Sequence, residues 1–270
     1  HDRDPPRIRF CDGRLTGGEL VSRIVEGFFI QKSCQDNALD LDLGDLVLEA
    51  SQLTGDEFRA NGLSLDKTGV LPGATFAIAK VGEERVEIIQ AGDCFALWAK
   101  GDEIEATSNQ IRGHDDEFKG LIERLQRRIA KEKYKIELEA ATPEQSKIIR
   151  EEMWLEFRPE WQKGRARDIN NPSSPKCYGL LNGQVELEQV WIRKTIPRNK
   201  LNTLLLFTDG MVPYETYKEK NDREIVREIY AAYRRGGLLE SLRIVRLTEE
   251  KFRAVAWTDA AEAAAIAIDF

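Results

Sequence analysis

Histidine, paired cysteine and long apolar runs are all scarce in this chain, and each scarcity argues against a class of protein. The 270 residues include two histidines and four cysteines, and no two cysteines form a CxxC pair. A structural zinc site needs clustered Cys and His ligands, so we expect none. No stretch approaches the roughly 20 apolar residues of a membrane span, and no signal peptide is recognisable, so a cytoplasmic protein is expected.

The cysteines are separate from one another along the chain. Cys11 and Cys94 stand beside apolar runs, and we expect both to be buried structural thiols in a reducing compartment. No cysteine has the surroundings of a nucleophile.

An excess of basic residues is also lacking. The formal net charge is −7, and no dense basic face offsets it, which argues against nucleic-acid binding. The composition is 41% hydrophobic and 32% charged, enough for one large core under a well-solvated surface. A single domain over residues 1–270 is therefore expected, while no pattern predicts the oligomeric state.

Short apolar or alternating segments, bounded by Gly, Pro, Asn or Asp, predict buried strands. These segments are residues 74–80, 86–90, 95–99, 185–192, 204–207 and 264–270. Gly92-Asp93 separates two of them as a hairpin turn would, and Asn182-Gly183 is a second turn signal. Most strands thus come in hairpin-like runs, which favours antiparallel pairing.

Apolar residues at helical spacing predict helices between these strands. The helical segments are residues 18–29, 46–53, 118–129, a stretch capped by Thr142 with Pro143 in its first turn, and residues 225–233 ended by Gly236-Gly237. The pattern predicts an α+β fold in which helices cover antiparallel sheets. The highly charged region from about 113 to 175 is interpreted as a helical insertion.

Two acidic-glycine pairs follow apolar or alternating strands, and a third lies in a turn. They are Asp12-Gly13, Asp209-Gly210 and Gly92-Asp93. A carboxylate at a strand end, beside a glycine that lets the backbone approach closely, can bind a hard cation through oxygen atoms. Each pair alone is more often a simple turn dipeptide. The three acidic-glycine pairs in this order are more informative than any one pair alone.

A series of motifs carries a family resemblance over nearly the whole chain. In order, they are Asp12-Gly13 before the Gly17-Gly18 helix start, the strand at 73–79, the Ala-Gly-Asp-Cys turn at 91–94, the Tyr-Gly-Leu-Leu-Asn-Gly segment at 178–183, the strand and Asp-Gly pair at 204–210, and the last strand at 264–270. The sequence resembles the metal-dependent type 2C protein phosphatases, particularly their compact bacterial members. The match is weakest in the helical insertion, which would correspond to the variable flap of that family.

The resemblance implies two stacked antiparallel β-sheets flanked by helices, with a binuclear Mn²⁺ or Mg²⁺ site at one end. Asp12 matches the bridging carboxylate, Gly13 would add its carbonyl oxygen, and Asp209 matches the ligand from the second sheet. Asp93 matches an aspartate that helps hold a third ion in some members. Oxygen ligands are the ones that these cations prefer.

Two further parts of the family's site are harder to place on this sequence. The last metal ligand corresponds to Glu262 when counted back from the terminal strand, while Asp259 is the nearest upstream aspartate. The family's first strand, with an acidic ligand and a phosphate-binding arginine, is expected to lie before His1. The arginine is left unassigned.

The implied activity is hydrolysis of phosphoserine and phosphothreonine in proteins by a metal-activated water, with Asp12 and Asp209 as the central carboxylates. The substrate would be a phosphorylated protein, expected in bacterial signalling. The alternative is a catalytically weak or inactive relative that uses the same fold as a protein-binding regulatory module.

Some polar and aromatic residues suggest a site but have a simpler interpretation. His114 next to Asp115 and Asp116 is interpreted as a helix start with an acidic first turn, not as a catalytic dyad. Trp154 and Trp161, like Trp191, are expected to pack in the core or the insertion.

Overall fold

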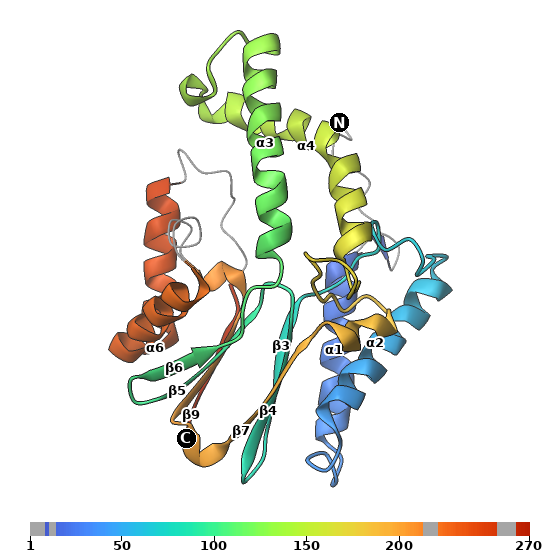
Figure 1. The fold of residues 1–270 in the computed structure, drawn as a ribbon, viewed down its shortest axis with the longest axis vertical. Coiled ribbons are helices and arrows are strands. Elements are labelled where there is room, and N and C mark those ends of the chain that lie inside the picture. Colours follow the sequence, from blue (N-terminus) through green and yellow to red (C-terminus); the bar gives the residue numbers. More distant parts are fainter. Residues whose placement is uncertain (1–8, 11–14, 213–220, 253–262) are drawn as a thin grey trace.

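A computed structural model describes residues 9–10, 15–212, 221–252 and 263–270. Two antiparallel sheets form its centre, with strand orders β3-β4-β7 and β6-β5-β8-β9, and a short β1-β2 pair lies apart from them. Figure 1 shows α1 and α2 on one side of the sheets, α6 on the other, and α3 and α4 beyond one end. The predicted α+β class with two antiparallel sheets and flanking helices is confirmed.

The elements have the following bounds. The strands are β1 (Arg9–Phe10), β2 (Leu15–Thr16), β3 (Phe76–Val81), β4 (Arg85–Ala91), β5 (Phe95–Lys100), β6 (Glu103–Ala106), β7 (Ile192–Pro197), β8 (Thr203–Phe207) and β9 (Ala265–Asp269). The α-helices are α1 (Gly17–Ser33), α2 (Leu43–Ala60), α3 (Arg112–Lys133), α4 (Pro143–Asp168) and α6 (Asp222–Phe252). Short 3₁₀ helices are η1 (Leu138–Ala140), η2 (Val185–Gln189), η3 (Arg198–Lys200) and η4 (Asp209–Met211).

The two sheets stack because apolar side chains of β4, β5, β7 and β8 pack together between them. Successive side chains of a strand point to opposite faces. On β5, Phe95 and Leu97 pack in one cluster with apolar side chains of α6, while Ala96 and Trp98 pack in another with side chains of β4 and β7. The second cluster, which includes Ile88, therefore lies between the sheets.

Helices α1 and α2 cover the outer face of the three-stranded sheet. Val21 of α1 and Val47 of α2 are fully buried in one cluster with Ile89 of β4. The start of α1 is fixed by a capping box, in which the Thr16 hydroxyl accepts the Glu19 N–H and the Glu19 carboxylate accepts the Thr16 N–H. No helix of the described residues is both long and apolar enough to cross a membrane.

The charged region expected to be a helical insertion contains α3 and α4, which pack on each other. Their shared cluster includes Phe118 from α3 with Ile149 and Phe157 from α4. The predicted cap of α4 is present, because Thr142 and Gln145 exchange hydrogen bonds in a capping box and Pro143 occupies the first turn. The division of the chain into a domain and an insertion stays a prediction.

One sequence prediction needs correction and another is confirmed with an addition. The strand predicted for residues 185–192 is wrong: Val185–Gln189 is a 3₁₀ helix with one fully buried apolar anchor, Leu187, and the strand begins only at Ile192. The helix expected to end at Gly236-Gly237 does break there, where Gly237 has φ +70°, but a second helical stretch follows within α6. Glycine pairs interrupt a helix without determining what comes next.

Candidate active site

Asp93 lies in the tight turn that joins β4 to β5. Gly92 has φ +80°, a conformation that L side chains rarely adopt, and a Cβ placed on it would lie 2.1 Å from the Thr75 Cγ2 atom. The turn is held by polar side chains, since the Gly92 N–H donates to Gln110 Oε1 at 2.8 Å and Gln90 Nε2 donates to the Gly92 carbonyl at 2.9 Å. Asp93 is thus presented, half-buried, by a rigid turn.

Gly92→Ala is expected to lower the free energy of unfolding by about 3 kcal/mol, because backbone strain and a clash with Thr75 add together. The matched control is Gly101→Ala at the other end of β5. Gly101 also has a positive φ, +63°, but a Cβ there meets nothing within 4 Å, so only the strain of about 1 kcal/mol remains. Urea unfolding with chelator present measures both. Equal losses would contradict the account of the turn.

Asp209 opens the short helix η4, two residues after the end of β8, which is the neighbour of β5 in the four-stranded sheet. Phe95 and Phe207 are partners in the antiparallel register, and their rings stack at 5.2 Å. Asp93 lies two residues before Phe95 and Asp209 two residues after Phe207, so both lie at the same edge of the sheet. The register therefore brings together two carboxylates that are far apart in the sequence.

The pKa of Asp209 agrees with a position close to Asp93. Burial among protein atoms, followed by the charge of Asp93, raises the pKa of Asp209 to about 6. The Asp209 side chain is nonetheless exposed to solvent, and water at its surface opposes the effect of burial. The repulsion between the two carboxylates is therefore the more important cause, and a bound cation would reverse it.

A third carboxylate, which the sequence interpretation missed, belongs to the same group. Asp115 in the first turn of α3 has a pKa raised to about 7 by burial, then by the charges of Asp93, Asp116 and Asp209. Its side chain is exposed as well. The start of α3 is fixed by Asn109, whose Oδ1 accepts the N–H of Ile111 at 2.8 Å. Asp115 in the first turn of α3 is therefore within electrostatic range of Asp93 and Asp209.

The remaining predicted ligands are not placed by the structure. Asp12, Gly13, Asp259 and Glu262 lie outside the described residues, so their roles stay predictions. Within the described part of the chain, no three His, Cys, Asp or Glu side chains converge closely enough to hold a metal ion.

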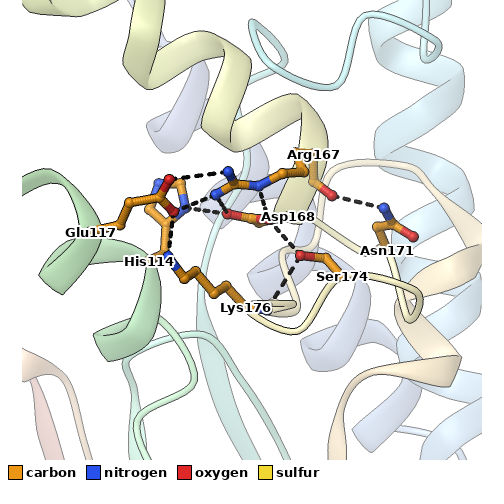
Figure 2. A network of polar contacts seen from close by, with 7 residues as sticks. All are labelled: His114, Glu117, Arg167, Asp168, Asn171, Ser174 and Lys176. Carbon is orange, nitrogen blue, oxygen red and sulfur yellow. Dashed lines mark hydrogen bonds and ion pairs between the residues drawn. The ribbon is translucent and has the colours of Figure 1, made fainter.

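His114 begins a buried polar network that joins the start of α3 to the end of α4 (Figure 2). Its Nδ1 atom lies 2.8 Å from Asp168 Oδ2, and both side chains are almost fully buried. The Ser174 hydroxyl donates to Asp168 Oδ1 at 2.6 Å, and Arg167 donates to both oxygens of Asp168. The predicted helix start is confirmed, but the partner of His114 was not foreseen.

The geometry of this network indicates a structural role and not a catalytic one. Burial would raise the pKa of Asp168, but hydrogen bonds from Arg167, Ser174 and His114 lower it to about 2. The serine hydroxyl donates to the carboxylate and not to the histidine, so no base activates it as a nucleophile. The network fixes the first turn of α3 and with it the position of Asp115.

Cys94 follows Asp93 directly but is not a nucleophile. Its side chain is 4% exposed, and burial raises the pKa of the thiol to about 12, to which the charges of Asp93 and Asp209 contribute. A thiol that stays protonated is unreactive. The predicted buried structural thiol is confirmed here, while Cys11 lies outside the described residues.

No protein-family model and no curated protein matches the chain. Among solved structures, Stp1 from Staphylococcus aureus is 15% identical, with a TM-score of 0.45 over 87% of this chain and 73% of that one. PstP/Ppp from Mycobacterium tuberculosis is 13% identical, with a TM-score of 0.46 over 87% and 77%. The catalytic domain of PstP in complex with two manganese ions is 12% identical, with a TM-score of 0.47 over 93% and 80%.

All three are serine/threonine phosphatases. They are the kind of protein that the sequence motifs resemble. The two-sheet fold rests on the chain's own strand pairing.

Proposed function

We propose that this chain hydrolyses phosphoserine and phosphothreonine esters of proteins with two, or with Asp93 three, bound Mn²⁺ or Mg²⁺ ions. The observation that carries the proposal is the β5–β8 register, which sets Asp93 and Asp209 at one sheet edge. Asp115 from α3 lies within range of both charges. The substrate is a phosphorylated protein, and residues 113–175 form a helical insertion beside the site of a single domain.

The side chains present fit hard divalent cations. The donors at the sheet edge are carboxylates, and Asp209 and Asp115 both have pKa values raised in part by neighbouring negative charge. A cation bound between such groups would remove that repulsion. Asp12 and Gly13, together with Asp259 or Glu262, are proposed to complete the ligand set.

The chain's own residues explain why a cation is needed. A phosphate ester carries negative charge and is repelled by a site made of carboxylates alone. Bound Mn²⁺ or Mg²⁺ would supply positive charge for the phosphoryl oxygens and lower the pKa of water. Asp93 and Asp209 would hold these ions, while Cys94, with its raised pKa, takes no part as a nucleophile.

The test is phosphate release from a phosphothreonine peptide and from p-nitrophenyl phosphate, with Mn²⁺, with Mg²⁺ and with excess chelator. We expect turnover with a divalent cation and its loss with chelator, because the carboxylates alone repel the substrate. The protein should be assayed with any native sequence that precedes His1. Absence of turnover in a folded, metal-loaded protein would contradict the proposal and favour the alternative of a protein-binding module.

A further inference from the structure

A second site candidate is an open pocket of about 590 Å³ between α4, the start of α1 and the loop before β3. The α4 side is formed by Trp154, Arg158, Trp161, Gln162 and Arg165. The other walls are residues 16–18 and 69–73. None of the described carboxylates at the sheet edge, Asp93, Asp115 and Asp209, lines this pocket.

The charge of this pocket is opposite to that of the chain. The chain has 47 acidic and 40 basic residues, yet the described residues that line the pocket include two arginines and no Asp or Glu. Neither Arg158 nor Arg165 forms an ion pair with a described residue. The pocket therefore presents positive charge that the described part of the chain does not neutralise.

Arg165 is held in place rather than free in solvent. Its Nη2 atom donates to the Leu71 carbonyl at 3.0 Å, and its guanidinium lies 4.6 Å from the centre of the Trp161 ring. The Nε atom is buried without a hydrogen-bond partner. Gly69 fixes the opposite wall, because a Cβ there would lie 2.3 Å from the Gln162 carbonyl oxygen. A fixed guanidinium loses little entropy when it binds an anion.

The start of α1 adds to this preference for negative charge. Gly17 and Gly18 form the first helical turn and line the pocket, and N–H groups of a first turn have no acceptor within the helix. The partial positive charge of a helix N-terminus favours an anion at this position. The feature supports the arginines and would not define a site without them.

The aromatic wall indicates what kind of anion fits. Trp154 and Trp161 are half-buried with ring centres 5.3 Å apart, and they leave part of their surface in the pocket. Tryptophan and arginine are the residues that dominate binding energy at protein interfaces. A small inorganic anion would not use the indoles, whereas a peptide with both apolar and acidic side chains would use the whole pocket.

We propose that this pocket binds an acidic peptide segment of a partner protein, with its carboxylates against Arg158 and Arg165 and its apolar side chains against the two indoles. The binding needs neither metal nor turnover. It therefore stands independently of the phosphatase proposal, and either can fail without the other.

The probe is a short fluorescein-labelled peptide of alternating glutamate and leucine, compared with a matched glutamine peptide, by fluorescence anisotropy with chelator present. The main variant is Arg158→Glu, which should weaken binding about tenfold or more because it reverses a charge in the pocket. The matched control is Arg150→Glu, which makes the same change on α4 outside the pocket, and its effect should stay below about threefold. Arg158→Gln, which only removes the charge, should lie between them.

Circular dichroism first shows that each variant is folded, and Arg158→Gln serves if Arg158→Glu is not. Selective loss at Arg158 with binding of the glutamate peptide alone supports the proposal. Equal binding of both peptides, no binding of the glutamate peptide up to about 1 mM, or equal weakening by Arg150→Glu would each overturn it.

Discussion

Asp209→Asn should lower Mn²⁺-dependent phosphate release by at least about a hundredfold, because loss of cation charge at the phosphoryl group costs several kcal/mol of transition-state stabilisation. The change keeps the shape of the side chain and removes its charge. It also removes repulsion with Asp93, so the variant should fold at least as stably as the wild type. Lost activity with retained stability is the combination that identifies a functional carboxylate.

The matched control is Asp102→Asn, in the turn at the far end of β5. Asp102 stands beside Gly101, as Asp209 stands beside Gly210, but it lies away from the sheet edge that holds Asp93. Its activity should stay within about twofold of the wild type. Similar activity of the two variants would show that Asp209 does not hold a required cation.

Asp168→Ala should cost about 3 to 5 kcal/mol of unfolding free energy, the effect expected when a buried, hydrogen-bonded charge pair is broken. The change leaves His114 buried beside an empty space and removes the acceptor for Ser174. Urea unfolding with chelator present measures the loss. Glu117→Gln, which alters only the partly exposed contacts to Arg167 and Lys176, should cost less than about 1 kcal/mol.

The same carboxylate should produce a pH dependence of stability. Its pKa falls from the ordinary 3.8 to about 2 in the folded protein, so the ionised form stabilises the fold. That contribution is complete above about pH 4 and is lost as the pH falls toward 2. Asp168→Ala should therefore lose less stability than the wild type between pH 4 and pH 2. Equal slopes for the two proteins would contradict a role for the ionised carboxylate.

The sheets were predictable because their strands carry strong local signals. β5 and β8 are continuous apolar runs, as expected for strands buried on both faces, and each meets a Gly-Asp or Asp-Gly pair at the same sheet edge. The strand predicted for residues 185–192 was wrong because its apolar residues alternate with glutamates, as they would in a strand. In the fold only Leu187 is fully buried, and Val185 is 56% exposed. Alternation alone does not distinguish a strand from a short 3₁₀ turn.

The parts of the site that the sequence did not predict depend on distant contacts. His114 and Asp168 are 54 positions apart, and they meet because the packing of α3 on α4 brings the start of one helix to the end of the other. The sequence gives no reason to assign Asp115 to the site, because acidic residues are common in the first turn of a helix, where they interact favourably with the helix dipole. Its relation to Asp93 and Asp209 appears only once α3 is placed at the sheet edge.

The central claim is that carboxylates at this edge hold catalytic cations, and the most direct test is the number of Mn²⁺ ions bound at equilibrium. Electron paramagnetic resonance of free Mn²⁺ measures it for the wild type and for Asp209→Asn. The account predicts at least two bound ions in the wild type and the loss of at least one in the variant. Binding of the same number with the same affinity by both proteins, or no binding by either, would contradict it.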